Sequence, residues 1–222
     1  MKKIIKIFSI LFLVCFSFYY TEKIAIIMKN KDSLMIEINN LKDNYNIDYV
    51  NAIIEGDTII PGINGLSINS DKSYANMKAL NVFNEYYLKY DQIKPEISLM
   101  DNKDKIIIKG NKNKNAISFI LKNNDKIKKY LEQNGYKIDY KGICIININD
   151  NCSSTNLKVK PTKNINHQNI FLQKKEIESG DIILIEENLS IEEIKLIIEE
   201  IKYRDLKIVS LNDLINEENN IK

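Results

Sequence analysis

The chain has 222 residues, and 44% of them are hydrophobic, which is enough to build a core in one domain or in one domain plus a smaller module. Basic and acidic residues nearly balance, so the formal net charge is only +2. This balance gives no electrostatic footprint for nucleic acid, which we exclude as a partner. The three cysteines form no Cys-x-x-Cys motif, so a thiolate zinc site is not supported.

The first residues predict a membrane segment. Lys2 and Lys3 precede residues 4–20, which are apolar except for one lysine and two serines. A basic start followed by such a run is typical of a signal peptide or an uncleaved anchor. No small-x-small cleavage motif follows, since the chain continues Phe18-Tyr-Tyr-Thr-Glu-Lys23. We therefore predict a membrane anchor at residues 1–22, with its basic end inside the cell and the bulk of the chain outside.

Residues 23–44 show apolar side chains at helical spacing, which predicts a stalk helix after the anchor. Residues 45–110 change character and predict a small α+β module. Within it, residues 49–54 and 58–60 flank Glu55-Gly-Asp57, a pattern that predicts a β-hairpin.

Three further features complete this part of the chain. A helix is predicted from Ser70 to Leu80. The tyrosines between Tyr74 and Tyr90 either pack a small core, which we favour, or stack on sugar rings. Residues 105–109 and 115–121 are two apolar runs around a turn, and they predict a second hairpin or paired strands.

Residues 111–222 alternate between strand and helix patterns. Ser190-Ile-Glu-Glu193 is a capping box, and the helix that it opens lies between an apolar strand at 181–185 and another at 207–210. This order is a βαβ unit, so its two strands should be parallel with a right-handed crossover. The other predicted elements are strands at 115–121, 142–148 and 157–161 and helices at 123–134 and 211–216.

The last βαβ unit resembles that of NodB-homology polysaccharide deacetylases. In that family a Gly-x-Ile-Ile-Leu-Leu-His strand precedes a helix and a strand with the phrase Val-x-Leu-x-x-Leu. Here the frame reads Gly180-Asp-Ile-Ile-Leu-Ile-Glu186 and then Val209-Ser-Leu-Asn-Asp-Leu214. The resemblance implies an α/β fold that is a truncated or distorted β/α barrel over residues 111–222. An open α/β sheet is the alternative, because about four β/α steps are too few for an eightfold barrel.

The resemblance also implies a metal-assisted hydrolase, with an Asp pair after a Thr-Phe strand, two His ligands and a late His acid. In this sequence Ser118-Phe119 matches Thr-Phe, and the Asp pair falls on Ile120 and Leu121. The late His position holds Glu186, and His167 is the chain's single histidine. The sequence therefore predicts no metal site, no cofactor and no standard catalytic residue.

Other chemistry centres on Glu186. Glu186 and Glu187 follow a parallel strand, where β/α proteins place their sites, and Asp150 follows another predicted strand. A carboxylate pair could serve glycoside hydrolysis, with Glu186 as the candidate. The simpler interpretation, which we favour, is that both glutamates are solvated acids near a helix start. We likewise interpret His167 as a surface loop residue.

These observations predict a single-pass protein of the cell membrane whose bulk is extracytoplasmic. We predict that it lacks the catalytic machinery and binds cell-wall glycan or an envelope protein. The alternative is a hydrolase that acts on cell-wall polysaccharide through a non-standard site. Cys144 and Cys152 could pair in an oxidising exterior or remain unpaired, and the sequence leaves both options open.

Overall fold

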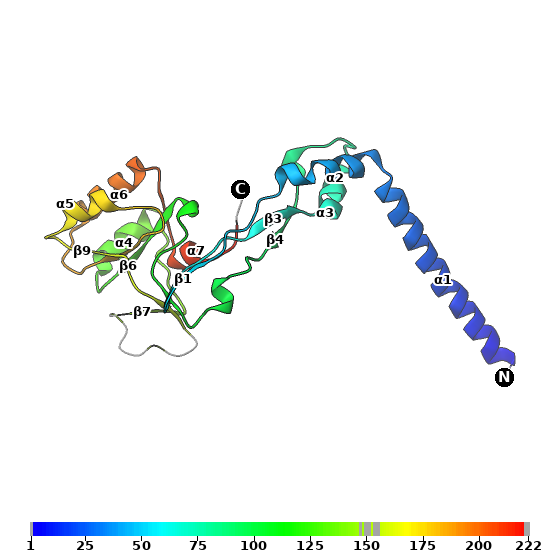
Figure 1. The fold of residues 1–222 in the computed structure, drawn as a ribbon, viewed down its shortest axis with the longest axis horizontal. Coiled ribbons are helices and arrows are strands. Elements are labelled where there is room, and N and C mark those ends of the chain that lie inside the picture. The colour runs from blue at the N-terminus through cyan, green and yellow to red at the C-terminus, as the bar shows by residue number, and fades with distance from the viewer. Residues whose placement is uncertain (1, 147, 149–151, 153–155, 220–222) are drawn as a thin grey trace. The chain divides into compact units, whose positions relative to one another are not determined.

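The computed structural model describes residues 2–146, 148, 152 and 156–219 (Figure 1). The chain divides into two compact units, one of residues 1–47 and 66–91 and the other of residues 48–65 and 92–222. This division differs from the predicted one, because residues 45–110 contribute to both units instead of forming a module of their own.

The first unit begins with α1 (Lys2–Asn30), a single long helix (Figure 1). Its segment Ser9–Asn30 is long and apolar enough to cross a membrane, and none of it is buried against other parts of the chain. The apolar segment therefore extends beyond the predicted boundary at residue 22.

The helical conformation is interrupted between α1 and the next helix. The predicted stalk at 23–44 is not continuous, because α2 (Ser33–Tyr45) starts anew after the carboxylate of Asp32 accepts a hydrogen bond from the Leu34 N–H at 3.0 Å. The same carboxylate pairs with Lys78 at 2.5 Å, and these contacts lower the pKa of Asp32.

The first unit also contains α3 (Ser70–Met77) and residues 66–68 and 90–91 of a two-stranded sheet, which is formed by β3 (Gly65–Ile68) and β4 (Tyr90–Ile93). The helix α3 ends before the predicted Leu80. The small core of the first unit consists of Leu34, Ile38, Ile68, Met77 and Leu88. Tyr74 and Tyr90 pack against this core, as we expected, whereas Tyr86 is 88% exposed.

The second unit contains two sheets. The four-stranded sheet is parallel throughout, in the order β11-β6-β10-β9; its strands are β6 (Ala116–Leu121), β9 (Lys163–Ile165), β10 (Ile182–Ile185) and β11 (Lys207–Val209). The five-stranded sheet has the order β1-β2-β5-β8-β7; its strands are β1 (Ile53–Glu55), β2 (Thr58–Ile60), β5 (Ile106–Ile107), β7 (Ile143–Ile145) and β8 (Leu157–Val159).

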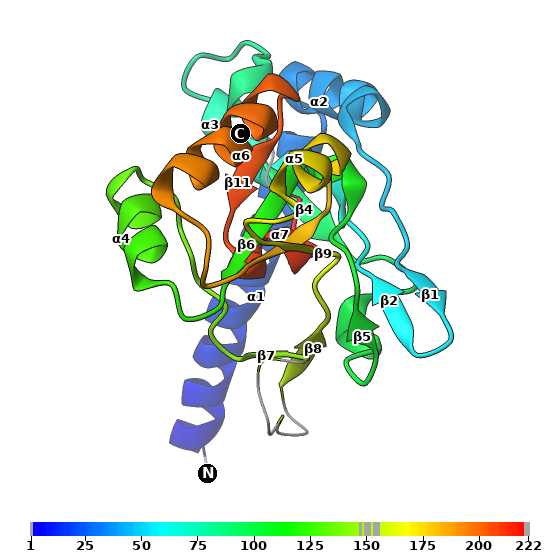
Figure 2. The ribbon, with the colours of Figure 1, turned by 90° about the vertical axis from the view of Figure 1, so that its left-hand side faces the viewer.

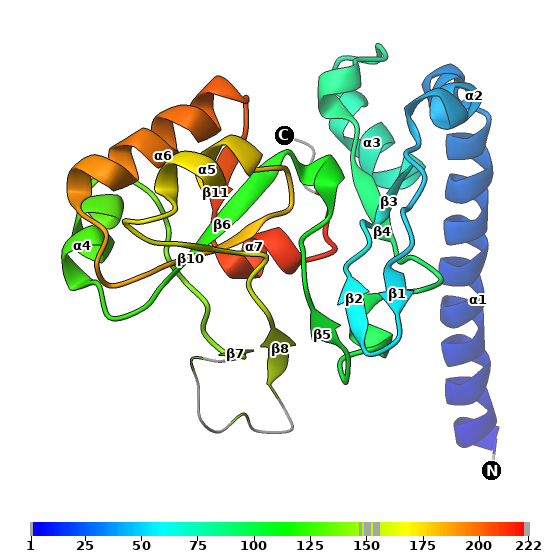
Figure 3. The same cartoon turned by 60° about the vertical axis from the view of Figure 1, so that its left-hand side comes forward.

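Helices cover the four-stranded sheet on both faces (Figures 2 and 3). Three lie on one face: α4 (Asp125–Gln133), α5 (Ile170–Gln173) and α6 (Ile191–Tyr203). The short α7 (Leu211–Ile215) lies on the other face, together with the five-stranded sheet. Every residue of β6 and β10 is buried, which explains why both strands are apolar runs rather than alternating ones.

Alternate residues of β6 serve two different cores. Ile117 and Phe119 join the outer core, packed against α4, α5 and α6. Ala116 and Ile120 join the inner core, which also contains Leu214 of α7 and residues of the five-stranded sheet. Successive side chains of a strand point to opposite faces, so a strand that is covered on both faces contributes alternate residues to two cores.

The final βαβ unit confirms the prediction of parallel strands. Strands β10 and β11 run parallel, and β6 lies between them and pairs with both. The capping box is present, since the Ser190 hydroxyl accepts from the Glu193 N–H and the Glu193 carboxylate accepts from the Ser190 N–H. Gly135, two residues after the end of α4, has φ +81°, the left-handed conformation that often follows a helix end.

Two predictions in the middle of the chain need correction. The hairpin at 53–60 is present, with antiparallel β1 and β2, but residues 105–109 and 115–121 do not pair. Instead β5 joins β2 and β8 in the five-stranded sheet, whereas β6 belongs to the other sheet. Apolar patterning identifies a buried strand but not its partner, and here the partners come from distant parts of the sequence.

Candidate functional site

Parallel strands of the four-stranded sheet end at a common edge, where sequence reasoning placed the candidate site. Ile185 of β10 is aligned with Leu121 of β6 and Ile165 of β9. Lys122 and Glu186 follow directly, and each donates its backbone N–H to the neighbouring strand at 3.0 Å. The structure therefore brings these two charged side chains together.

The carboxylate of Glu186 lies 3.5 Å from the Lys122 ammonium. The Glu186 side chain is 25% exposed and that of Lys122 is 41% exposed, so water screens this pair. Asp150, the other predicted strand-end acid, lies outside the described residues.

The loop after Glu186 is hydrogen-bonded to Asn124, the residue that caps the start of α4. The side-chain amide of Asn124 donates to the carbonyls of Glu187 and Leu189 at 3.2 Å, and its oxygen caps α4 by accepting from the Ile127 N–H. A cavity of about 390 Å³ lies beside this loop. It is lined by Asn124, Lys126, Ile127, Glu187, Asn188, Leu189, Ser190, Ile191 and Glu192.

His167 is tied to the capping box of α6. Its Nδ1 lies 2.5 Å from the Glu193 carboxylate, which also accepts from the Ser190 N–H and hydroxyl at 2.8 Å. Burial alone would raise the pKa of Glu193, but these hydrogen bonds outweigh it and lower the pKa. The His167 side chain is 72% exposed, so the structure places it on the surface, in a helix-capping arrangement.

The positions that match the family's Asp pair are apolar and buried. Ile120 is fully buried in the inner core, and Leu121 is 8% exposed in the outer core. Ser118, at the Thr position, is also fully buried, and its hydroxyl is the one buried side-chain polar atom without a hydrogen-bond partner among the described residues. Within the described ranges, no three His, Cys, Asp or Glu side chains gather as a metal site would require.

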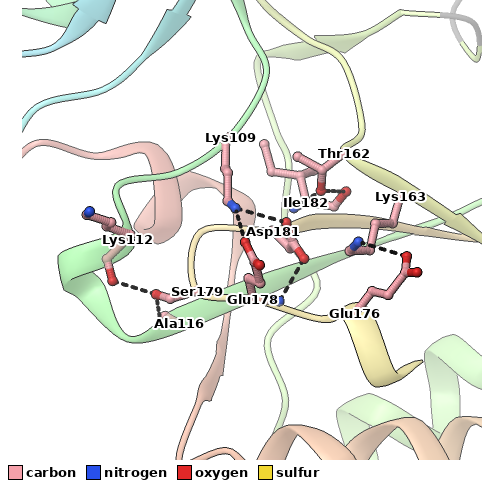
Figure 4. Close-up of polar contacts among 10 residues, drawn as sticks. All are labelled: Lys109, Lys112, Ala116, Thr162, Lys163, Glu176, Glu178, Ser179, Asp181 and Ile182. Carbon is pink, nitrogen blue, oxygen red and sulfur yellow. Dashed lines mark hydrogen bonds and ion pairs between the residues drawn. The ribbon is translucent and has the colours of Figure 1, made fainter. Parts of the chain in front are cut away.

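The opposite end of β10 carries a polar cluster whose role is structural (Figure 4). The Asp181 carboxylate is nearly buried; it accepts from the Glu178 N–H at 2.9 Å and lies 3.6 Å from the Lys109 ammonium. Lys109 also pairs with the Glu178 carboxylate at 3.0 Å, which lowers the pKa of Glu178. Lys109 thus interacts with two carboxylates at once, and these contacts hold the β5–β6 connection against the start of β10.

Two larger cavities border α7 and the residues after it, and sequence reasoning missed them. One has a volume of about 580 Å³ and is lined by Asn64, Lys94, Leu99, Met100, Leu157, Asn212, Asp213, Ile215, Asn216, Glu217 and Glu218. The other has about 490 Å³ and is lined by Ile63, Asn113, Lys114, Ala116, Lys207, Val209, Asp213, Glu218 and Asn219. These residues come from distant segments, so no local motif could have revealed the cavities.

Lys114 borders the second cavity. Its ammonium donates to the backbone carbonyl of Asp213 at 2.7 Å and also to that of Asn216. Burial lowers the pKa of Lys114 to about 8, although the nearby carboxylates of Asp213, Glu217 and Glu218 oppose the shift. The lysine thus fastens the chain after α7 to the start of β6.

Comparison with known proteins by sequence gives a match over part of the chain. No protein-family model matches the chain. The Bacillus subtilis protein YlxY, described as uncharacterized, is 36% identical over 93 residues. The match spans 41% of this chain and only 29% of YlxY, so the two share less than a third of the length of YlxY.

Solved structures give a broader match. BA3943, a CE4 family pseudoenzyme from Bacillus anthracis, is 16% identical and matches with a TM-score of 0.57 over 86% of this chain and 97% of its own. A BA3943 mutant with restored enzymatic activity is 18% identical and matches with a TM-score of 0.58 over 85% of this chain and all of its own. The chain therefore has the mixed α/β fold of a CE4-type deacetylase pseudoenzyme, which confirms the predicted resemblance at the level of the fold.

Proposed function

We propose that this chain is a membrane-anchored extracytoplasmic protein that lacks deacetylase activity and binds cell-wall glycan. The observation that carries the proposal is the burial of Ile120 and Leu121, at the two positions where the resemblance implies the Asp pair that binds the metal and acts as base. Neither an isoleucine nor a leucine has a donor atom for a metal or a proton to transfer. The fold has been kept while this part of the catalytic edge has become hydrophobic core.

The state of Glu186 supports the same proposal. It stands where the family has its late histidine, and its carboxylate pairs with Lys122 instead of facing an acidic partner. A retaining or inverting glycosidase needs two carboxyl groups across the scissile bond. The ion pair therefore favours a structural role for Glu186 over the alternative of a hydrolase.

Two features support the extracytoplasmic location. The apolar helix segment Ser9–Asn30 is long enough to span a bilayer. Cys144 and Cys152 form a disulfide, the pairing that the sequence had left open, and disulfides persist in oxidising compartments outside the cytosol. The similarity to BA3943 supports the proposed lack of activity instead, because that protein has a similar fold and is described as a pseudoenzyme.

The test uses the full chain purified in detergent. We expect it to co-sediment with purified peptidoglycan and to release no acetate from peptidoglycan or N-acetylated chitooligosaccharide, with or without added Zn²⁺. We expect Glu186→Gln to behave like wild type in both assays. Acetate or reducing-sugar release that the Glu186→Gln variant loses would replace the proposal with the hydrolase alternative. Absence of binding to peptidoglycan would reject the glycan-binding function.

A further inference from the structure

The two cavities beside α7 adjoin, because both are lined by Asp213 and Glu218. Each has a volume within the range of roughly 300–1,000 Å³ that is usual for ligand sites. We call their combination the α7 cleft. Together the cavities favour an elongated ligand over a compact one.

The α7 cleft is remote from the edge that sequence reasoning selected. Its second cavity is bordered by Ala116, the first residue of β6, and by Lys207, the first residue of β11. Lys122 and Glu186 follow the last residues of β6 and β10. The cleft therefore reaches the opposite end of the same strands and is distinct from the degenerate catalytic edge.

The cleft walls carry hydrogen-bonding groups that the fold does not use. Asn64 and Asn212 are half-buried, and within the described part of the chain their side-chain amides bond to no other group. Asn216 uses its side-chain oxygen for the Glu218 N–H, which leaves its NH₂ group free. A carboxamide offers one acceptor and two donors, so it is complementary to another amide group.

The floor between these amides is apolar. Leu99 and Ile215 are buried in the inner core beneath the cleft, whereas Met100 is 58% exposed. An apolar floor within a polar wall suits a ligand with a C–H face and hydrogen-bonding edges, as a pyranose ring or an acetyl methyl group provides.

The charged side chains that line the α7 cleft balance in number, which favours a neutral ligand. They are three lysines and three acids: Lys94, Lys114, Lys207, Asp213, Glu217 and Glu218. The carboxylates of Asp213, Glu217 and Glu218 act electrostatically on the Lys114 ammonium. Because neither sign predominates in the lining, a polyanion or a polycation would gain little from the summed charge of the walls.

From this arrangement we infer that the α7 cleft binds a neutral oligosaccharide through its acetamido groups, with Asn64 and Asn212 as the residues that recognise them. The inference rests on the proposed glycan-binding function and assigns that function to a specific place. It predicts a preference for N-acetylated over deacetylated sugar, because only the acetamido group matches the carboxamides in both hydrogen bonding and charge.

The experiment is calorimetric titration of the full chain in detergent with the tetramer of N-acetylglucosamine and, in parallel, with the tetramer of glucosamine. We expect the acetylated tetramer to bind at least about tenfold more tightly. Asn64→Ala and Asn212→Ala should each weaken its binding about fivefold to tenfold, the effect of losing one hydrogen bond of ordinary strength. Asn188→Ala, a matched loss of one carboxamide at the strand-end cavity, should leave the affinity unchanged.

The outcomes separate this inference from the function on which it rests. If Asn188→Ala weakens binding and both cleft variants do not, the cleft assignment is wrong and glycan binding stands. Equal affinity for the two tetramers would overturn the role given to the acetamido group. If neither tetramer nor peptidoglycan binds the wild-type chain, the proposed function itself is wrong. Circular dichroism shows whether each variant is folded, and the two cleft asparagines lie far apart in sequence, so one misfolded variant leaves the other as a test.

Discussion

The carboxylate of Glu217 accepts a hydrogen bond from the backbone N–H of Leu99 at 2.8 Å, across 118 positions of sequence. The same oxygen accepts from the Gly62 N–H at 2.9 Å, and Glu217 is only 8% exposed. One side chain therefore joins three segments of the second unit: the turn after β2, the turn before β5 and the end of the chain after α7.

Replacement of Glu217 should be strongly destabilising. Glu217→Ala leaves two buried N–H groups without an acceptor, and we expect it to lower the free energy of unfolding by about 2–4 kcal/mol. Glu218→Ala removes the exposed neighbouring carboxylate and should change the stability by less than about 0.5 kcal/mol. Urea denaturation of the two variants in detergent measures both stabilities. Similar denaturation midpoints for Glu217→Ala and Glu218→Ala would contradict the proposal that the Glu217 carboxylate stabilises the fold by joining the three segments.

Lys114 should make stability depend on pH in the alkaline range. Its pKa is about 8 in the folded chain and 10.5 when unperturbed, so the folded state resists its protonation. This penalty is complete below pH 8, shrinks as pH rises from 8 to 10.5, and is absent above, where the amine is neutral in both states. Relative to Lys114→Met, the wild-type chain should therefore gain stability across this window.

We expect the gain to be about 1–2 kcal/mol, since solvent screens a half-buried amine. The measurement is the difference in unfolding free energy between wild type and Lys114→Met at pH 7.5 and pH 10. Using the difference removes the effects of the tyrosines, whose titration is common to both proteins. A difference that stays constant, or that moves in favour of the variant, would show that the amine is not desolvated.

Gly180 is required by both its conformation and its surroundings. It has φ +89°, and a Cβ atom there would lie 2.3 Å from the Gly110 carbonyl oxygen. We expect Gly180→Ala to cost at least about 3 kcal/mol, because backbone must move. Gly135→Ala is the matched control: its φ is +81° but no atom lies within 4 Å of the added Cβ, so only about 1 kcal/mol of backbone strain is expected. Equal thermal midpoints for the two variants would refute the steric argument.

The disulfide between Cys144 and Cys152 should stabilise the second unit. A closed loop of this length restricts the unfolded chain by about 2.5 kcal/mol in the loop-entropy model. Dithiothreitol treatment and the Cys152→Ala substitution should therefore lower the unfolding free energy by similar amounts. Cys15→Ser, which alters the free cysteine of α1, should have no effect, and alkylation mass spectrometry before and after reduction should report one disulfide.

Local interactions explain what the sequence determined by itself. The capping box at Ser190, the buried apolar run of β10 and the hairpin at 53–60 each depend on residues within one turn or one strand, and all three are present. Periodicity and caps act at short range, so a single sequence contains their full signal. The resemblance to deacetylases depended on the same local frame, and for that reason it held at the level of the fold.

Only the tertiary structure decided which strands pair and where polar groups meet. Nothing near β5 indicated that its partners are β2 and β8, and nothing near Glu217 indicated that it bonds to Gly62 and Leu99. The α7 cleft likewise unites asparagines that are 148 positions apart in the sequence, at 64 and 212. Such contacts are selected by the burial and hydrogen-bond satisfaction of the whole chain, and these are properties of the packed fold.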